Sequence, residues 1–272
     1  MKMAIYNSSI IKKGNNVLIL GIDLEGINEN LFEKGVNTKV DRVIEIGAVL
    51  WETKRSCPIK FYSELIDERD RLRLSEEVIE LTGIDEDLLK DYALRGDEIR
   101  RALERLSLVM KKADFLMAHN GLKYDKPMLE AMYKRYDLEM PNKTWIDTQN
   151  DIEYPKKITH KSMSALEHAH GFINPFPHRA VTDVLSMLKI ASHYDYNRMA
   201  TLAQSPKVKI VAELKAPNWK DKAQVEKFNA IKNKVARARF TWDPSEKKWY
   251  KYIHRIHIDE NSLNFDFNWS IE

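Results

Sequence analysis

The sequence predicts an α/β fold in which a mixed sheet is covered by helices. Three strand-like segments come first, at residues 17–24, 42–51 and 60–67, and helical and strand-like segments alternate after them. Three consecutive strands favour an antiparallel meander, and the alternation that follows adds helices to the faces of the sheet. Polar residues that act in such sheets gather at strand ends and helix starts.

Each predicted element rests on its own residue pattern. The first two strands are apolar and rich in β-branched residues, and the third alternates in polarity. Ser75 is placed to cap the start of a helix over 74–83, and Gly83 is placed to end it. Apolar spacing predicts further helices at residues 84–92, 97–113, 125–136, 162–172 and 180–194. Two more strands are predicted at residues 113–120 and 143–148, which makes five in all.

Composition limits the class of protein. The 272 residues are 43% apolar and 31% charged, with a net charge of +3, which suits one large domain or a domain with a smaller module. No apolar run reaches the roughly 18 residues of a membrane span, and the first 16 residues lack a signal-peptide pattern. The single Cys57 excludes an internal disulfide, so we expect a cytoplasmic protein with no membrane association.

Charge is distributed unevenly along the chain. Residues 207–255 contain 14 Lys or Arg and 5 Asp or Glu, a balance of +9, which leaves −6 for the remainder. We therefore predict a main domain over residues 1–200 and a small basic α+β module over residues 205–272.

The predicted module combines cations with aromatic residues. It is expected to contain a Lys-rich helix and then a hairpin whose turn is flanked by Trp242 and Trp249. The strands of this hairpin are expected at residues 240–242 and 249–258. Aromatic rings beside Lys and Arg suit single-stranded nucleic acid, whereas bulky aromatics also build the core of a small unit. We assign most of the Trp residues to the core and nucleic-acid binding to the Lys and Arg face.

Carboxylates occur at three separate places, each at the boundary of a predicted element. Asp23 and Glu25 end the first strand and share a face, because residues i and i+2 of a strand point the same way. Asp125 follows the fourth strand, and Asp183 lies one turn into the helix over 180–194. Neighbouring carboxylates repel each other unless a cation lies between them. Magnesium prefers oxygen ligands, and four carboxylates could hold two such ions.

His178 lies five residues before Asp183 and adds a group that can accept a proton from water. Two divalent ions about 3.5–4 Å apart stabilise the attacking and leaving oxygens in phosphodiester cleavage. Taken singly, each group has a simpler explanation: a solvated turn for Asp23 and Glu25, a helix cap for Asp125, and an exposed carboxylate for Asp183. Their combination favours a metal site.

These stretches resemble the DEDDh group of 3′→5′ exonucleases, which includes the proofreading subunit of DNA polymerase III, exonuclease X and ribonuclease T. The resemblance covers roughly residues 15–195 and includes the segments RVIEIGAVLW and LTGIDEDLL. The residues that match the three motifs of the group, in order, are Asp23 and Glu25, then His119, Asn120, Tyr124 and Asp125, and finally His178 and Asp183.

The resemblance implies a ribonuclease-H-like fold and a two-metal mechanism. It implies that His178 is the general base, and that two Mg²⁺ or Mn²⁺ ions are held by Asp23, Glu25, Asp125 and Asp183. The residues that we expect near the substrate are Leu24, Gly26, Asn120 and His119. For His119, we favour a structural role over a direct contact.

The sequence departs from the group directly after Glu25. The group commonly has Thr-Thr-Gly or a similar polar segment there, but this chain has Gly26 and Ile27. A hydroxyl group that would lie near the terminal nucleotide of the substrate is therefore absent. A long loop over residues 27–41 is a second departure.

The functional hypothesis is a metal-dependent 3′→5′ exonuclease that releases nucleoside 5′-monophosphates. Nucleic acid is the expected partner, and the basic module favours the 3′ ends of single-stranded DNA. An RNA-trimming exonuclease with the same chemistry remains an alternative, because the 2′-hydroxyl is recognised by details of the pocket. A non-catalytic nucleic-acid-binding protein is the other alternative, although the complete set of carboxylates and His178 argues against it.

Overall fold

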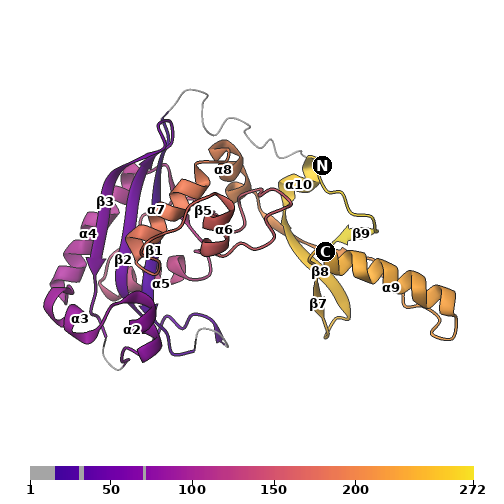
Figure 1. Cartoon of the computed structure of the whole chain (residues 1–272), viewed down its shortest axis with the longest axis horizontal. Helices are drawn as coiled ribbons and strands as arrows, with labels where there is room; N and C mark the ends of the chain where they lie inside the picture. Colours follow the sequence, from indigo (N-terminus) through magenta and orange to yellow (C-terminus); the bar gives the residue numbers. More distant parts are fainter. Residues whose placement is uncertain (1–15, 31–33, 70–71) are drawn as a thin grey trace. The chain divides into compact units, whose positions relative to one another are not determined.

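The computed structural model of the 272-residue chain describes residues 16–30, 34–69 and 72–272. The chain divides into two compact units, with the boundary between Ala203 and Gln204 (Figure 1). The first unit contains a sheet of five strands, and the second contains a sheet of four. Nearly all of the N-terminal segment without a signal-peptide pattern, and residues 31–33 of the predicted loop over 27–41, lie outside the described residues.

The sheet of the first unit is mixed, as the sequence predicts. Its strands lie in the order β3-β2-β1-β4-β5. β1, β2 and β3 form an antiparallel meander, whereas β4 and β5 run parallel to β1. The strands are β1 (Leu18–Ile27), β2 (Arg42–Glu52), β3 (Cys57–Leu65), β4 (Phe115–Ala118) and β5 (Trp145–Asp147).

The helices of the first unit begin close to the predicted positions. Ser75 caps the start of α2, where its hydroxyl accepts the N–H of Val78, and Gly83 ends α2 with φ of 69°. The helix over 196–204 was not predicted; it buries Met199, Ala200 and Leu202. The helices are α2 (Glu76–Thr82), α3 (Glu86–Tyr92), α4 (Asp97–Lys112), α5 (Asp125–Arg135), α6 (Met163–Ala169), α7 (Ala180–Ala191) and α8 (Tyr196–Gln204).

Helices cover both faces of this sheet, because β1 is apolar on both sides. Leu20, Ile22 and Leu24 of β1 belong to a buried cluster that includes side chains of α4 and α5. Ile19, on the opposite face, packs in a second cluster with Val184 of α7 and with side chains of α8. The face covered by α7 is also the face toward which Asp23 and Glu25 point, since they share the parity of Ile19.

The second unit is a four-stranded antiparallel sheet with the order β7-β8-β6-β9. The predicted hairpin is present, and Trp242 pairs with Trp249 across it. Strands β6 and β9 were not predicted, because each pairs with segments that lie far from it in the sequence. The elements are β6 (Lys207–Ala212), α9 (Lys222–Arg237), β7 (Thr241–Asp243), β8 (Lys248–His254), α10 (Arg255–Asp259) and β9 (Trp269–Ile271).

The second strand of the hairpin is shorter than the sequence suggests. It ends at His254, and the residues from Arg255 form α10 instead of continuing as a strand. The N–H of Arg255 donates to the carbonyl of Pro206, and the N–H of Ile256 donates to the hydroxyl of Ser205, which turns the chain at this point. Among the described residues, no helix is long and apolar enough to cross a bilayer.

Candidate active site

Asp23 and Glu25 lie near the end of β1, on the face covered by α7. In the antiparallel pairing with β2, Asp23 is opposite Gly47 and Glu25 is opposite Glu45. The pairing register shifts between Glu25 and Gly26, so a bulge follows the second carboxylate directly. Bulges re-aim the strand locally and are frequent beside active sites. Both carboxylates are half-buried.

Helix α7 approaches this face of the sheet closely because two glycines leave room for it. A Cβ atom on Gly47 would lie 2.3 Å from the carbonyl carbon of Ala180 and 2.4 Å from the nitrogen of Val181. A Cβ atom on Gly21 would lie 2.7 Å from a side-chain methyl of Val184. Because Gly47 pairs with Asp23, the close approach brings the first turn of α7, which contains Asp183, to the carboxylates of β1.

The loop that precedes α7 is tied to Asp183 from two sides. The Asn174 amide donates to Oδ1 of Asp183 at 2.6 Å, and the backbone N–H of His178 donates to Oδ2 at 3.1 Å. His178 is exposed and has φ of 60°, a conformation that is uncommon outside glycine. One possible ligand atom from each of Glu25, His178 and Asp183 lies within 4.8 Å of the others.

Asp125 approaches the carboxylates of β1 from the opposite face of the sheet. It is the first residue of α5 and is 2% exposed. Its Oδ1 accepts the backbone N–H of Leu24 at 3.0 Å, which fixes it to the residue between the two carboxylates of β1. Gly121 permits the tight turn before α5, because a Cβ atom there would lie 2.2 Å from the Cβ of Ala118.

Burial raises the pKa of each of the four carboxylates, and mutual repulsion adds to it for Asp23 and Glu25. Burial raises the pKa of Asp23 well above its ordinary value, and Asp125 and Glu25 raise it further. Burial, and then the charge of Asp183, raises the pKa of Glu25 to about 8. Burial also raises the pKa of Asp125 to about 7 and that of Asp183 to about 6.

A divalent cation bound among these carboxylates would offset these shifts by favouring the charged form. Half-buried carboxylates without a compensating cation favour the protonated form, and oxygen ligands of this kind suit Mg²⁺ or Mn²⁺. The residues present therefore fit the metals that the sequence implies.

A partly buried ion pair beside the site was not predicted from the sequence. Glu45 is 1% exposed and pairs with Arg179, whose Nη2 lies 2.9 Å from its Oε1. The other oxygen of Glu45 accepts the N–H of Ala180, the first residue of α7. Glu45 therefore holds the start of α7 against β2, and Arg179 supplies a positive charge near Glu25. The one signal in the sequence was Glu45, a charged residue inside the otherwise apolar run VIEIGAVLW.

The residues expected near the substrate occupy different environments. Leu24 is 4% exposed and packs in the core, so only its backbone faces the site. Gly26 lies beneath the Tyr124 hydroxyl, which would be 2.3 Å from a Cβ atom on Gly26 and which donates to Asn28 at 3.2 Å. A hydroxyl group therefore lies beside Gly26 although the residue itself has none.

His119 and Asn120 follow β4 and contact the loop after β5. Both ring nitrogens of His119 bond to the protein, one to the Thr148 hydroxyl and one to the Lys161 carbonyl, each at 2.8 Å. Asn120 has φ of 59°, and its N–H donates to the buried Asp147. These contacts favour a structural role for His119. Asp147, which fixes the Asn120 turn, was not singled out in the sequence.

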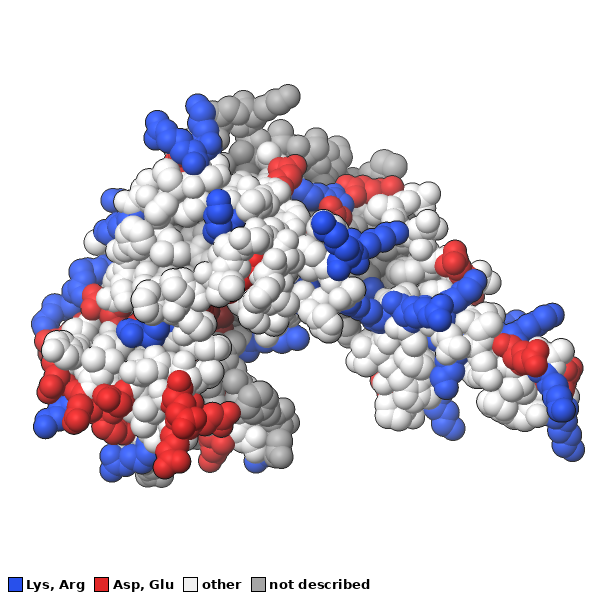
Figure 2. Space-filling view, in the orientation of Figure 1, with Lys and Arg blue, Asp and Glu red and all other residues white. Residues whose placement is uncertain are grey.

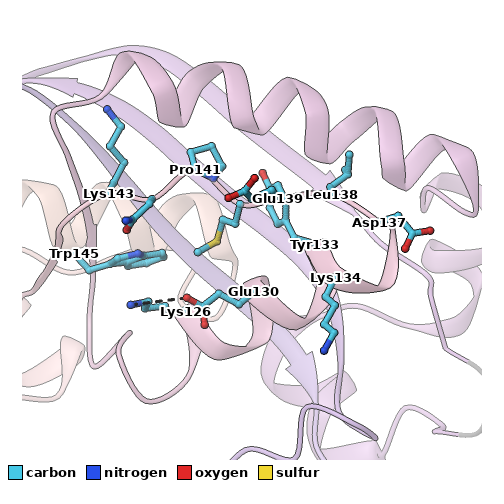
Figure 3. A pocket seen from close by; sticks show the side chains of 12 residues that line it. Lys126, Glu130, Tyr133, Lys134, Asp137, Leu138, Glu139, Pro141, Lys143 and Trp145 are labelled. Carbon is cyan, nitrogen blue, oxygen red and sulfur yellow. Dashed lines mark ion pairs between the residues drawn. The ribbon is translucent and has the colours of Figure 1, made fainter.

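A separate surface pocket of about 440 Å³ lies beside α5 and β5 (Figure 3). Its lining mixes both charges, as in the ion pair between Lys126 and Glu130, with the buried Trp145. None of the clustered carboxylates lines it. The pocket is therefore distinct from the acidic site.

Comparison with known proteins identifies the fold. A family model for exonucleases (RNase_T) matches residues 20–191. The nuclease domain of 3′hExo, a DEDDh family member bound to rAMP, has a TM-score of 0.53 and 19% identity, and the match covers 66% of this chain and 92% of that chain. A structure of 3′-end-specific recognition of the histone mRNA stem-loop by 3′-exonuclease has a TM-score of 0.52 and 18% identity, over 66% of this chain and 82% of that one.

A more distant structure also has this fold. The zinc-bound E. coli ExoI–ssDNA complex has a TM-score of 0.52 and 14% identity, and the match covers 65% of this chain and 40% of that chain. No curated protein matches the chain.

The mixed five-stranded sheet with helices on both faces is the ribonuclease-H-like fold of the DEDDh nucleases, so the predicted fold class is confirmed. The matched residues make up more than half of the chain and include all four clustered carboxylates and His178. The chain belongs to the exonuclease family, and the resemblance to DEDDh 3′→5′ exonucleases is confirmed.

Proposed function

We propose that this protein is a metal-dependent 3′→5′ exonuclease that removes nucleoside 5′-monophosphates from the 3′ end of DNA. The observation that carries the proposal is the convergence of four carboxylates and a histidine from three separate segments of the chain. They come from β1, from the start of α5, and from the loop and first turn of α7.

Each residue has a role that follows from its position. Asp23, Glu25, Asp125 and Asp183 would hold two Mg²⁺ or Mn²⁺ ions, which when bound stabilise negative charge on the phosphodiester. His178 is exposed beside Asp183, where it can accept a proton from the attacking water. Arg179 and Glu45 hold the first turn of α7 in place.

The choice of DNA rests on the basic second unit, whose Lys and Arg residues suit contacts with the phosphates of a DNA strand. RNA is the second candidate, since the structural neighbours include a complex with an mRNA stem-loop as well as one with ssDNA. A cytoplasmic location fits the single free Cys57, because a reducing compartment keeps thiols unpaired.

The proposal is tested with a single-stranded DNA labelled at its 5′ end, beside an RNA of equal sequence. Each is incubated with the wild type and with Asp183→Ala in Mg²⁺, Mn²⁺ or chelator. We expect a metal-dependent ladder that shortens from the 3′ end, with a loss of more than about 100-fold in the variant.

Glu104→Ala is the matched control, because it removes an exposed carboxylate from α4. It should keep the wild-type rate. Retention of activity by Asp183→Ala would contradict the proposed mechanism, whereas binding without cleavage by the wild type would favour a non-catalytic protein. The faster substrate decides between DNA and RNA.

Gly26→Ala is expected to lower the exonuclease rate by about 10- to 100-fold, because small displacements of catalytic groups have effects of this size. The new methyl group would overlap the Tyr124 hydroxyl at 2.3 Å and push it from Asn28, which shifts the residue next to Asp125. Gly26→Ala combined with Tyr124→Phe removes the overlapping oxygen and should recover activity relative to Gly26→Ala alone. A double variant no faster than the single one would refute this account.

A further inference from the structure

Helix α9 of the second unit is unusually exposed. Of its 16 residues, only Val235, close to its C-terminal end, is buried. Figure 1 shows the helix extending away from β7 and β8, so its earlier turns have no sheet beneath them. Helices of this length gain most of their stability from packing. An exposed helix of this kind is therefore a surface available to a ligand.

Apolar side chains form a stripe along the exposed part of α9. Val225, Phe228 and Ile231 follow one another at three-residue intervals, and Ile231 is 39% exposed. Trp219, in the segment before the helix, is 69% exposed, and its ring lies 5.8 Å from that of Phe228 in an edge-on arrangement. An exposed indole fixed beside a helix can stack on a planar ligand.

The cations of α9 are largely uncompensated. Lys222, Lys227 and Lys232 have no ion pair within the described part of the chain, and Glu226 is the single acidic residue of the helix. At 100° per residue, Lys227 and Lys232 lie on either side of the apolar stripe. In Figure 2, Lys and Arg side chains stand out from the part of the unit where α9 lies.

The lysines of the neighbouring sheet differ in this respect. Lys209 contacts both Glu246 and Glu272, and Lys248 contacts the same two glutamates. This part of the sheet, on β6 and β8, is therefore close to neutral, whereas α9 keeps a net positive charge. This contrast locates the basic character of the second unit on the helix.

We propose that Trp219, Phe228, Lys222, Lys227 and Lys232, here called the α9 surface, bind single-stranded nucleic acid away from the 3′ end that enters the active site. The lysines would contact phosphates, and Trp219 would stack on a base. Charge complementarity favours this occupant over a second copy of the chain, since two such surfaces would repel each other. The inference rests on the proposed exonuclease function for its substrate class.

The test measures binding of the full chain to a fluorescent 25-nucleotide single strand in chelator, which prevents cleavage. We expect Lys222→Gln/Lys227→Gln/Lys232→Gln to weaken binding at least about 10-fold. The salt dependence should become less steep by about 2 in a plot of log K against log salt, since each phosphate contact to a single strand contributes about 0.7. Trp219→Ala should weaken binding by about 10-fold with an unchanged salt slope.

The matched control is Lys207→Gln/Lys209→Gln/Lys248→Gln, which removes the same charge from the β6 and β8 strands of the same unit. It should alter affinity and salt slope much less than the α9 triple variant does. Equal effects of the two triple variants would indicate general charge attraction and overturn the proposal. Wild-type affinity and slope in the α9 variant would also overturn it, and a dimer lost in that variant would assign the surface to self-association.

Hydrolysis separates this inference from the proposed function. The α9 triple variant should degrade a trinucleotide at the wild-type rate but a 25-nucleotide strand more slowly at low concentration. If the wild type degrades neither substrate, the exonuclease proposal fails. The binding result in chelator still decides whether the α9 surface holds nucleic acid.

Discussion

Asp125→Asn is expected to lower exonuclease activity by more than about 100-fold and, at the same time, to stabilise the metal-free protein at pH 8. Asp125 is 2% exposed, and burial raises its pKa to about 7, although its own backbone N–H and that of Leu24 lower it. Asparagine keeps an oxygen that can accept the Leu24 N–H. The substitution therefore removes a buried charge without leaving that donor unpaired.

The stability effect has a definite sign with pH. The ordinary pKa of an Asp carboxyl is 3.8, so the unfolded chain loses this proton before the folded protein does. The metal-free wild type therefore loses stability as the pH rises from about 4 through about 7, and the variant lacks this loss. The gain in unfolding free energy should be smaller at pH 5 than at pH 8, where it should reach roughly 2–4 kcal/mol.

Urea denaturation in chelator at pH 5, 6.5 and 8 measures this difference. Glu104→Gln is the control, because it neutralises an exposed carboxylate and should show no such trend with pH. Added Mg²⁺ should stabilise the wild type more than the variant, since a ligand of the folded state stabilises it more when it binds more tightly. A variant no more stable than the wild type at pH 8 would show that the buried charge of Asp125 does not destabilise the metal-free protein.

Gly47→Ala is expected to impair both stability and catalysis. The added methyl group would meet backbone atoms of Ala180 and Val181 at 2.3 and 2.4 Å, and backbone cannot rotate away as a side chain can. The start of α7 must then move from β2, and Asp183 and His178 move with it. We expect unfolding free energy to fall by about 1–3 kcal/mol and activity to fall by about 100-fold.

Gly21→Ala is the matched control for this substitution. Gly21 lies on the same face of β1 under the same helix, but the atoms it would meet are side-chain methyls of Val184 and Leu188. These can adjust, so the loss of activity should be much smaller than for Gly47→Ala. Denaturation midpoints and single-turnover rates of the two variants compare the effects, and equal loss of activity would show that the start of α7 does not position the site.

Local residue patterns were sufficient for most elements of the first unit. The apolar segments that became β1 and β2 and the Ser75 cap of α2 depend on neighbours in sequence, and the sequence displays them. The second unit was harder, because β6 and β9 are short and acquire their partners from distant segments. The chain likewise leaves β8 after His254 because Arg255 and Ile256 contact Pro206 and Ser205, which no local pattern shows.

The sequence pointed to Asp23, Glu25, Asp125, His178 and Asp183 because they lie at the boundaries of predicted elements and match the motifs of the DEDDh exonucleases. Only the tertiary structure decided how they meet. Gly47 lets α7 lie directly on β2, and the buried Glu45 holds the first residue of α7. The backbone N–H of Leu24 donates to Asp125, which comes from the other face of the sheet. These contacts join residues up to 135 positions apart. Such long-range packing has no local pattern, so the sequence indicated the candidate residues but not how they are arranged in space.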